Sequence, residues 1–383
     1  MADNKENRIP NVPPLRFPGF SEEWERKRFR DVCNITTGNK NTQDKSDDGI
    51  YPFYVRSQIV ERINSWTFDG EAILTAGDGV GVGKVFHYST GKIGVHQRVY
   101  ILSDFKCDGK YLYSYFAGHF YNRVKRMSAK NSVDSVRMEM IADMPISLPS
   151  TEEQKKIGHL LALLDERIAT QNKIIEKLES LIKGLVDELM SVLLKGKLYP
   201  FSSFYIRAGE GGTPTTSIVE YYTEGTIPFI KIEDLSCKYL TNNKDFITEL
   251  GMQKSSAWLI PSKSVIYSNG ATIGAISINE YPVCTKQGIL GIVPNTNINV
   301  EYLYLLMSSS YFSKEISRII TEGTMKTAYL KDINHIKCPL PSKAQQKNIT
   351  NLTSSIEEKL SIELKYLFSL NRQKKYLLRQ MFI

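Results

Sequence analysis

The glycine-rich stretch GDGVGVGK at residues 77–84 is the segment whose residue types could bind a phosphate group. Phosphate-binding loops place glycines at set spacings, because the backbone there turns tightly or approaches the anion closely. The spacing here does not match: a P-loop that ends at Gly83-Lys84 requires glycine where Asp78 stands and Ser or Thr where Val85 stands. The stretch therefore predicts a tight turn or bulge between strands, with nucleotide binding through Lys84 as the alternative.

Other residues that could perform catalysis or hold a metal do not form recognisable sets. The five cysteines and five histidines are scattered, without a C-x-x-C pair or an H-E-x-x-H motif. The sequence also has no N-P-P-F or D-P-P-Y methyltransferase motif, no Walker pair and no convincing triad. We therefore predict no catalytic residue, no metal site, no cofactor bound by this chain, and cysteines that stay reduced.

Length and composition indicate a soluble protein of two or three domains. The chain has 383 residues, of which 42% are hydrophobic and 23% are charged, and these values are ordinary for globular proteins. The start, MADNKENRIPNVPP, lacks the apolar core of a secretory signal, and no stretch approaches the roughly 20 apolar residues of a membrane span. We expect a cytoplasmic protein. Its net charge of +8 permits nucleic-acid binding without demonstrating it.

The sequence contains an internal repeat half a chain long. ISLPSTEEQKKI, ending at Ile157, is matched by CPLPSKAQQKNI, ending at Ile349, so that Pro341 follows Pro149 by 192 residues. The shared residues are Leu148, Pro149, Ser150, Gln154, Lys155 and Ile157 in the first copy and Leu340, Pro341, Ser342, Gln346, Lys347 and Ile349 in the second. This period is too long for a solenoid and indicates a duplicated two-part module.

Each copy of the motif leads into a long helical pattern. Steps of four and three residues define a heptad seam in the first helix, typical of a coiled coil, with a globular core helix as the alternative. Its positions are Ile157, Leu161, Leu164, Ile168, Gln171, Ile175, Leu178, Ile182, Leu185 and Leu189. The second seam continues from Ile349 through Ile356, Leu360, Glu363, Leu367, Leu370, Leu377 and Met381. Polar residues interrupt it at Thr353, Glu363 and Lys374, beside Leu352, Leu364 and Leu378, so its apolar stripe is expected to wander.

The segments before the helices are mixed in character and share landmarks. GDGVGVGKV is matched by SNGATIGAI, which aligns Gly79 with Gly270 and Gly83 with Gly274. The organisation that we predict is a flexible N-terminal segment (1–15), a first mixed globular domain (16–146), a spacer helix (147–196), a second mixed globular domain (197–338) and a second spacer helix (339–383). The fold class is α+β: two mixed α/β domains separated by two long antiparallel helices that form a coiled coil with pseudo-two-fold symmetry.

This organisation suits a target that repeats at a fixed spacing, as duplex DNA does. About 40 helical residues span roughly 60 Å, and paired DNA readers commonly meet half-sites about one helical turn apart. Because the two readers differ in sequence, the predicted target is bipartite and asymmetric. The main alternative is a coiled-coil adaptor that binds proteins but not DNA, since heptads and mild basicity fit that function equally well.

The combination of these features resembles the specificity subunit of type I restriction-modification systems. LRFPGFSEEWERKRFRDV near the start, the repeated L-P-x-x-x-x-Q-x-x-I helix entry and the paired glycine turns carry the resemblance, which covers nearly the whole chain. It implies that each domain reads half of a split DNA site, while the helices dock two methyltransferase subunits that support motor-nuclease subunits. S-adenosylmethionine is then expected in the partner. Ala344-Gln345 departs from the usual acidic residue at the second helix entry.

Basic and amide side chains near the landmarks are candidates for DNA contacts, because phosphate contacts give affinity and base-edge contacts give specificity. The best local segment is RVKRMSAKNSVDSVR; its alternative is a solvated helix face on a tyrosine-rich core. The candidates are Arg56, Gln58, Gln97, Arg98, Arg123, Lys125, Arg126 and Lys130 in the first half and Lys231, Glu233, Asn269, Lys286, Gln287, Lys326 and Thr327 in the second.

The two polar seam positions Gln171 and Glu363 are also equivalent in the repeat. Both fall near the middle of their helices, and antiparallel helices would bring them together. A polar residue in a coiled-coil seam fixes register at some cost in stability. We therefore predict that these two side chains lie near one another.

Overall fold

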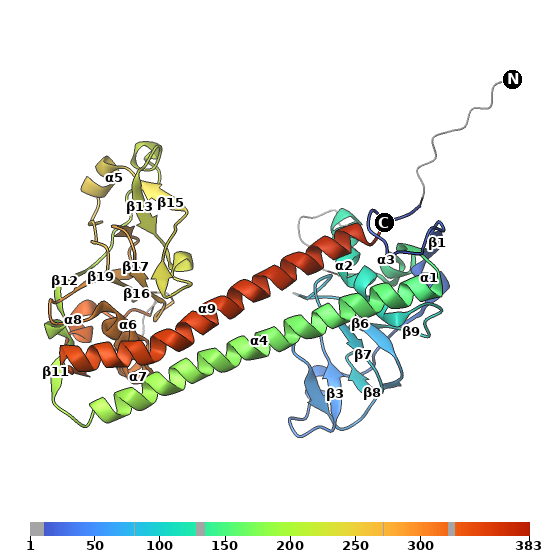
Figure 1. Ribbon diagram of the computed structural model, residues 1–383, viewed down its shortest axis with the longest axis horizontal. Coiled ribbons are helices and arrows are strands. Elements are labelled where there is room, and N and C mark those ends of the chain that lie inside the picture. The colour runs from blue at the N-terminus through green and yellow to red at the C-terminus, as the bar shows by residue number, and fades with distance from the viewer. Residues whose placement is uncertain (1–10, 80, 128–134, 271, 321–325) are drawn as a thin grey trace. The chain divides into compact units, whose positions relative to one another are not determined.

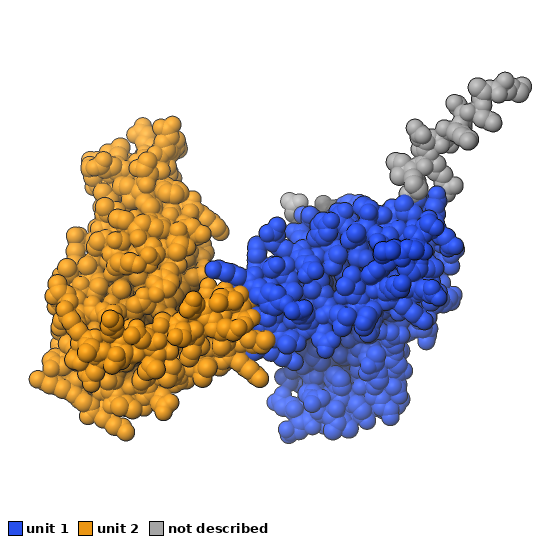
Figure 2. Space-filling view, in the orientation of Figure 1, with its two compact units in different colours: residues 1–173, 365–383 blue, residues 174–364 orange. Residues whose placement is uncertain are grey.

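The computed structural model describes residues 11–79, 81–127, 135–270, 272–320 and 326–383. The chain forms two compact units (Figure 2): unit 1 comprises residues 1–173 and 365–383, and unit 2 comprises residues 174–364. The division passes through both long helices, so each unit contains a part of each helix. The predicted domain boundaries follow the repeat instead, and they stay predictions.

Within its described residues, unit 1 forms two four-stranded sheets, a short two-stranded sheet and a helical layer that includes α2 and α3 (Figure 1). Its elements are β1 (Glu25–Arg28), α1 (Phe29–Val32), β2 (Asn34–Thr37), β3 (Tyr51–Tyr54), β4 (Glu61–Ile63), β5 (Phe68–Asp69), β6 (Ala72–Ala76), β7 (Phe86–Ser89), β8 (Lys92–Val95), β9 (Val99–Ser103), α2 (Gly109–Met127), α3 (Met138–Ala142), β10 (Pro145–Leu148) and the first half of α4 (Thr151–Leu193). The strand orders are β2-β9-β6-β7, β4-β3-β8-β5 and β1-β10.

Unit 2 repeats this plan with additions. Its elements are β11 (Leu198–Pro200), β12 (Tyr205–Glu210), β13 (Ile227–Ile230), β14 (Tyr239–Leu240), β15 (Asp245–Ile247), α5 (Glu249–Gln253), β16 (Val265–Ser268), β17 (Ile276–Asn279), β18 (Cys284–Thr285), β19 (Ile289–Pro294), α6 (Val300–Ser308), α7 (Ser310–Ile319), α8 (Leu330–Ile333), β20 (Lys337–Pro339) and the first part of α9 (Lys343–Gln380). The strand orders are β12-β19-β16-β17-β14, β15-β13-β18 and β11-β20.

The core of unit 1 explains why its central strand carries no polar face. All five residues of β6, AILTA, are buried, and the strand lies between β9 and β7. A strand covered on both faces reads as a continuous apolar run rather than an alternating one. Helix α2 contacts β6 and β7 and buries Leu112, Phe116 and Phe120, whose spacing of four residues places them on one helix face.

The repeated motif has a structural role that is the same in both units. Gln154 accepts a hydrogen bond from the backbone N–H of Asp108 (3.0 Å) and donates to Pro149 O (2.8 Å). Gln346 accepts from the N–H of Asn299 (2.7 Å) and donates to Pro341 O (2.9 Å). The glutamine of L-P-x-x-x-x-Q therefore ties the start of each long helix to the start of the helical layer, α2 or α6.

A buried tyrosine adds a second matched bond. Tyr111 donates from Oη to Ser147 O and Tyr302 donates to Pro339 O, each over 2.7 Å. Both side chains are completely buried. These bonds recur at equivalent positions, and the duplication inferred from the sequence is confirmed at the level of individual hydrogen bonds.

The glycine-rich stretch forms the turn between antiparallel strands β6 and β7, as predicted. Gly79 and Gly83 have φ angles of +80° and +67°, which glycine adopts without strain. No helix follows the turn, and Lys84 lies over the ring of Tyr121 at 5.5 Å. The arrangement is that of a hairpin rather than a phosphate-binding loop.

The predicted alignment of the two glycine turns is wrong by one residue at its start. The N–H groups of Gly77 and Asn269 donate to the equivalent carbonyls of Arg98 (2.8 Å) and Gly288 (3.0 Å). Gly77 therefore corresponds to Asn269, and Gly270 to Asp78 rather than to Gly79. The first connection, residues 77–85, is longer than the second, residues 269–275, and the shift follows from this difference in length.

Helices α4 and α9 run antiparallel, as predicted. Within unit 1, Asp165 forms an ion pair with Lys374, and Arg167 lies over the ring of Tyr366 at 5.4 Å. Residue numbers therefore rise along α4 in the direction in which they fall along α9. Within unit 2, the end of α4 and the start of α9 meet in one apolar cluster that contains Met190. Every seam position predicted on α4 is buried or half-buried.

The seam of α9 stays on one face at its first two breaks, whereas at the third Leu378 packs on the core of unit 1 beside Leu377, as expected of a wandering stripe. Leu352 and Leu364 are 54% and 44% exposed, whereas Thr353 in the seam is completely buried. The Thr353 hydroxyl donates to Thr350 O of its own helix (3.1 Å), which satisfies it without a change of face. Gln171 and Glu363 are both buried, but they belong to different units, and their mutual distance stays a prediction.

The chain segment around residues 11–24 is fixed to unit 1. Leu15 donates its N–H to Gln380 O (2.9 Å) at the end of α9. Arg16 donates to Glu153 from Nε (2.9 Å) and Nη2 (2.6 Å), and the Glu153 side chain is completely buried. The ring of Phe382 packs 5.2 Å from that of Tyr111. These contacts attach both the start of α4 and the end of α9 to the same core.

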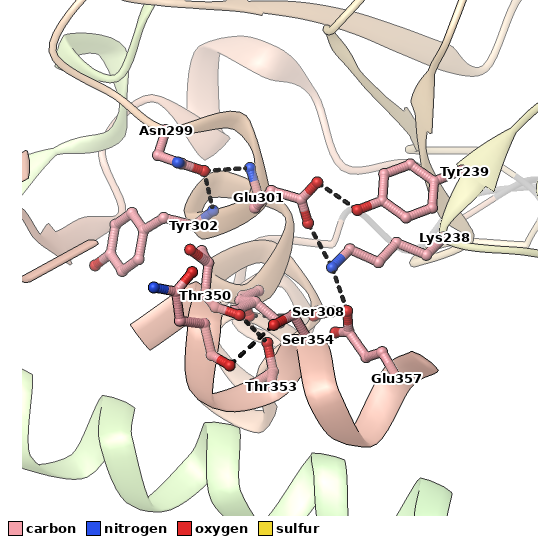
Figure 3. A network of polar contacts seen from close by, with 12 residues as sticks. Lys238, Tyr239, Asn299, Glu301, Tyr302, Ser308, Thr350, Thr353, Ser354 and Glu357 are labelled. Atoms are coloured by element: carbon pink, nitrogen blue, oxygen red, sulfur yellow. Dashed lines mark hydrogen bonds and ion pairs between the residues drawn. The ribbon is translucent and has the colours of Figure 1, made fainter. Parts of the chain in front are cut away.

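Unit 2 holds α9 with a different polar network (Figure 3). The Lys238 ammonium, just before β14, contacts Glu301 of α6 (2.5 Å) and Glu357 of α9 (2.6 Å). It also lies 5.3 Å from the ring centroids of both Tyr239 and Tyr304. Tyr239 in turn donates to Glu301 (2.5 Å). One lysine thereby connects a sheet edge, the helical layer and the long helix.

Candidate nucleic-acid interface

Three connections of unit 1 meet where strands β3, β6 and β8 end. The N–H of His96, after β8, donates to Tyr54 O at the end of β3 (3.0 Å). The N–H of Gly77, after β6, donates to Arg98 O. A Cβ at Gly81 would lie 2.3 Å from Arg56 O, so only glycine lets the turn approach the loop after β3 this closely. Sequence-distant candidate residues are brought together at this edge.

Two of the predicted DNA-contacting arginines share one carboxylate at this edge. Arg56 Nη1 lies 2.9 Å from Asp78 Oδ1, and Arg98 Nε lies 3.7 Å from Asp78 Oδ2. Arg98 is 64% exposed and Arg56 is 46% exposed. The guanidinium groups are thus oriented by Asp78 while their remaining donors face solvent. Arginine in this state can bind phosphate or a guanine edge in a bidentate manner.

Amide and imidazole groups complete the edge of unit 1. Gln97 is exposed and donates to Asn41 Oδ1 (2.6 Å), and Gln58 is exposed beside Arg56. His96 is buried and accepts a hydrogen bond at Nδ1 from the N–H of Arg98 (3.0 Å). Burial lowers the pKa of His96, with the charge of Arg56 acting in the same direction. A neutral imidazole therefore shapes the backbone that presents Gln97 and Arg98.

The corresponding edge of unit 2 is formed by the connections after β13, β16 and β18. The N–H of Lys286 donates to Ile230 O (3.0 Å), which joins the loop after β18 to the end of β13. Lys286 and Gln287 are exposed. Lys231 forms an ion pair with Asp245 (2.9 Å), while Glu233 is exposed. The same three connections meet in both units. They present a glutamine at one equivalent position, Gln97 and Gln287, and different charged groups around it.

Other predicted residues lie at different depths. Arg123 is half-buried and donates from Nε to Met140 O (2.9 Å), so it stabilises α3 rather than facing solvent fully. Lys125 and Arg126 are exposed in the last turn of α2, and Lys130 lies outside the described residues. In unit 2, Lys326 is exposed and Thr327 is half-buried.

Asn269 is the predicted contact that the structure places furthest from solvent. Its side chain is completely buried, and Nδ2 donates to Ala328 O (3.1 Å). Burial leaves it no surface for a base edge. The sequence pattern placed it correctly at the strand end but did not reveal that its side chain turns into the protein.

Sequence reasoning also missed residues that organise these edges. Asp78 holds two arginines, and Glu210 accepts from the N–H of Gly288 (2.7 Å) in unit 2. Tyr100 donates to Val136 O (2.9 Å). The position of Asp78 inside the glycine turn was a usable signal, because a carboxylate there lies beside Arg98 once the turn pairs with β9. No local pattern marked Glu210 or Tyr100.

Comparison with known protein families identifies both halves of the chain. The family model described as "Type I restriction modification DNA specificity domain" matches residues 21–180 and again residues 204–368. The chain belongs to this family. The membership agrees with the resemblance and with the two-fold repetition of the fold, and it does not favour a coiled-coil adaptor without DNA recognition.

Curated relatives carry the same description. The chain is 24% identical over 415 aligned residues to the type I restriction enzyme MjaVIII specificity subunit of Methanocaldococcus jannaschii, an alignment that covers 98% of this chain and 95% of the relative. It is 26% identical over 176 residues to the type I restriction enzyme EcoDI specificity subunit of Escherichia coli, covering 46% of this chain and 39% of that relative. The first alignment spans both repeats, the second only part of the chain.

A solved structure shares the fold. The type I restriction-modification system S subunit from M. genitalium superposes with a TM-score of 0.63 at 17% identity, covering 97% of this chain and 99% of that one. Among the residues that the structure describes, no helix is long and apolar enough to span a membrane, and no three His, Cys, Asp or Glu side chains are grouped as metal ligands.

Proposed function

We propose that this chain is the DNA-reading subunit of a type I restriction-modification complex and that each unit reads one half of a bipartite, asymmetric site. The observation that supports this is the repetition of one edge with different chemistry. Unit 1 presents Arg56 and Arg98 beside Gln97, and unit 2 presents Lys286 beside the equivalent Gln287. Different donor and acceptor patterns select different base pairs, so two such edges suit two different half-sites.

The long helices would set the spacing between half-sites and dock two methyltransferase subunits, which in turn connect to the motor-nuclease subunits. Exposed apolar side chains on both helices, such as Leu181 and Phe368, offer surface for protein contacts. The chain itself would be non-catalytic and would act in the cytoplasm. The partner would bind S-adenosylmethionine.

The test is to map methylated adenines in cells that carry the complete system. We expect one bipartite sequence to be modified in both halves, with a constant gap, and expect the motif to disappear when the gene for this chain is deleted. A methylation pattern that does not depend on this chain, together with no duplex preference in a salt-dependent binding assay of the methyltransferase complex, would instead favour the adaptor function.

A second measurement separates base contacts from phosphate contacts. Arg98→Ala should cost about 1–3 kcal/mol at a single base pair if Arg98 reads a base edge. If it contacts phosphate, binding to all sequences should weaken alike, with a smaller dependence on salt. An unchanged affinity and specificity would remove Arg98 from the interface.

A further inference from the structure

In each unit, a short segment is hydrogen-bonded to the edge at which the strands end, and we call it the return segment. In unit 1 this return segment is residues 135–137, which precede α3, and in unit 2 it is residues 326–328, which precede α8. The N–H of Val136 donates to Gly77 O (2.7 Å), and the N–H of Ala328 donates to Asn269 O (2.9 Å). Val136 and Ala328 are separated by the repeat length of 192 residues. Each unit therefore contains the same backbone hydrogen bond at equivalent positions.

A second bond to each return segment comes from a side chain that differs between the units. Tyr100 Oη donates to Val136 O (2.9 Å) in unit 1. Asn269 Nδ2 donates to Ala328 O (3.1 Å) in unit 2. The acceptors are equivalent carbonyls, but the donors come from different strands, β9 in the first case and the end of β16 in the second.

The two donors replace one another. Strand pairing places Tyr100 opposite Thr75 and Leu290 opposite Tyr267, which makes Leu290 the counterpart of Tyr100. Leu290 has no donor. At the other position, Gly77 has no side chain where unit 2 has Asn269. Each unit thus supplies one side-chain donor for the carbonyl, from the position that the other unit leaves apolar or empty.

Tyrosine at position 100 and asparagine at position 77 would compete for the same space. A Cβ at Gly77 would lie 3.1 Å from Cε2 of Tyr100 and 3.0 Å from Arg98 O. The tyrosine ring therefore occupies the space that an asparagine side chain would need. The compensating exchange indicates that the bond to the return segment is what both units retain, while the residue that makes it varies.

The bonded residues adjoin the candidate DNA contacts directly. Gly77 precedes Asp78, which holds Arg56 and Arg98, and the N–H of Asn269 donates to Gly288 O beside Gln287. A loss of the side-chain bond would free the return segment from this edge. It would also leave the buried carbonyl without its side-chain donor, which has a cost of its own.

We propose that Tyr100 and Asn269 are positioning residues for DNA recognition, each controlling the specificity of its own unit for one half-site. This inference rests on the proposed function. Neither side chain touches DNA in this mechanism: each holds a return segment against the strand ends, so that the exposed arginine, lysine and glutamine side chains keep one arrangement.

The test uses the full chain in complex with its methyltransferase subunits and measures equilibrium binding to four duplexes, with both, either or neither half-site intact. Tyr100→Phe should lower discrimination at one half-site by about tenfold, the equivalent of one hydrogen bond, and leave the other unchanged. Asn269→Ala should do the same at the opposite half-site. Tyr115→Phe is the matched control, because the Tyr115 hydroxyl donates to Pro145 O over the same 2.9 Å elsewhere in unit 1.

The most decisive experiment gives unit 1 the side-chain donor that unit 2 uses and measures discrimination at the half-site. The double variant Gly77→Asn with Tyr100→Leu transfers the arrangement of unit 2 to unit 1 and should restore the discrimination that Tyr100→Phe loses. The proposal is overturned if one single variant weakens discrimination at both half-sites, or if Tyr100→Phe and Asn269→Ala weaken it at the same half-site. It is also overturned if the loss equals that of Tyr115→Phe, or if the double variant does not recover discrimination. A wild-type complex without sequence preference would instead refute the proposed function.

Discussion

Units 1 and 2 attach the same kind of domain to a long helix with different polar groups. At the start of α4, Glu153 is buried and bound by Arg16 from the segment around residues 11–24. At the start of α9, Gln345 stands at the equivalent position, is exposed, and accepts a hydrogen bond from the N–H of Ser342 (3.0 Å). The first unit uses an ion pair to fix a distant segment, and the second caps its own helix.

Further along the helices, it is unit 2 that has the more buried ion pairs. In unit 2, Glu357 and Tyr304 close around Lys238. Their counterparts in unit 1, Asp165 and Tyr113, line a cavity of about 180 Å³, and Asp165 pairs with Lys374 of α9 instead. In the part of unit 1 that the structure describes, the sheet ends at β7 and has no counterpart of β14, the strand that follows Lys238 in unit 2.

The comparison shows which interactions define the duplicated scaffold. Hydrogen bonds directed at the backbone, from Tyr111 and Tyr302 and from Gln154 and Gln346, are the same in both units. Ion pairs between side chains differ. A backbone donor or acceptor is present whatever the side-chain sequence, and must be satisfied when it is buried. An ion pair depends on two side chains that can change together.

The largest effect is expected from Arg16→Ala. The variant leaves the Glu153 carboxylate buried without a counter-charge and should destabilise unit 1 by about 3 kcal/mol. Gln345→Ala, at the equivalent helix start in unit 2, should cost about 1 kcal/mol or less. Tryptophan fluorescence separates the units during denaturation, because Trp258 is the one tryptophan of unit 2 and Trp24 and Trp66 belong to unit 1. Equal losses would contradict the distinction between the two attachments.

Lys238→Met should have the next largest effect. The lysine side chain is 14% exposed, and Glu301 and Glu357 are 26% and 18% exposed, so the variant leaves two largely desolvated carboxylates facing one another. We expect unit 2 to lose about 2 kcal/mol. Lys374→Met in unit 1 removes a pair whose two side chains are each 31% exposed and should cost less than about 1 kcal/mol. The comparison fails if the second variant is the more damaging.

Gln154→Ala and Gln346→Ala test the shared part of the scaffold. Each variant removes a bond from a helix-start N–H and a bond to a proline carbonyl, and should destabilise its own unit by about 1–2 kcal/mol. Gln346 also donates to Asn297 O (3.1 Å), so its loss should be slightly larger. Gln253→Ala, at an exposed position on α5, serves as the control. A loss confined to one unit would show that the motif has lost its role in the other.

The sequence predicted the features that repeat with a regular period. Heptad spacing identified both long helices, and the 192-residue repeat identified two equivalent domains. The failed P-loop spacing around Asp78 and Val85 correctly predicted a turn between strands. These signals are local or periodic, and their physical cause, one apolar face or one backbone conformation, lies within the segment itself.

The sequence did not predict the direction of individual side chains at the strand ends. Asn269 turns inward because Ala328, 59 residues away, offers a carbonyl. Arg123 is held by its hydrogen bond to Met140 O. Leu352 and Leu364 stay exposed because the polar seam residues beside them, Thr353 and Glu363, are the ones that the fold buries. Such outcomes depend on partners brought close only by the tertiary fold, and no spacing rule encodes them.

The smallest expected difference between the units is their response to pH. Burial lowers the pKa of His87 and of His119 in unit 1 from the ordinary value of 6.5, and it also lowers the pKa of His96. Below about pH 6.5 the unfolded chain therefore binds more protons at these sites than the folded unit, and stability must fall as pH falls. Unit 2 contains a single histidine, His335.

We therefore expect that lowering the pH from about 7.5 to about 5.5 destabilises unit 1 more than unit 2. The ring of His119 stacks on Tyr115 at 4.5 Å and meets Phe382 at 5.8 Å, so a proton there would also charge the surface on which the end of α9 packs. Denaturation of the Trp258→Phe protein at both pH values follows unit 1 alone. His119→Gln should reduce its pH dependence, because the side chain that takes up the proton is gone. An identical pH response in the variant would assign the effect to His87 and His96.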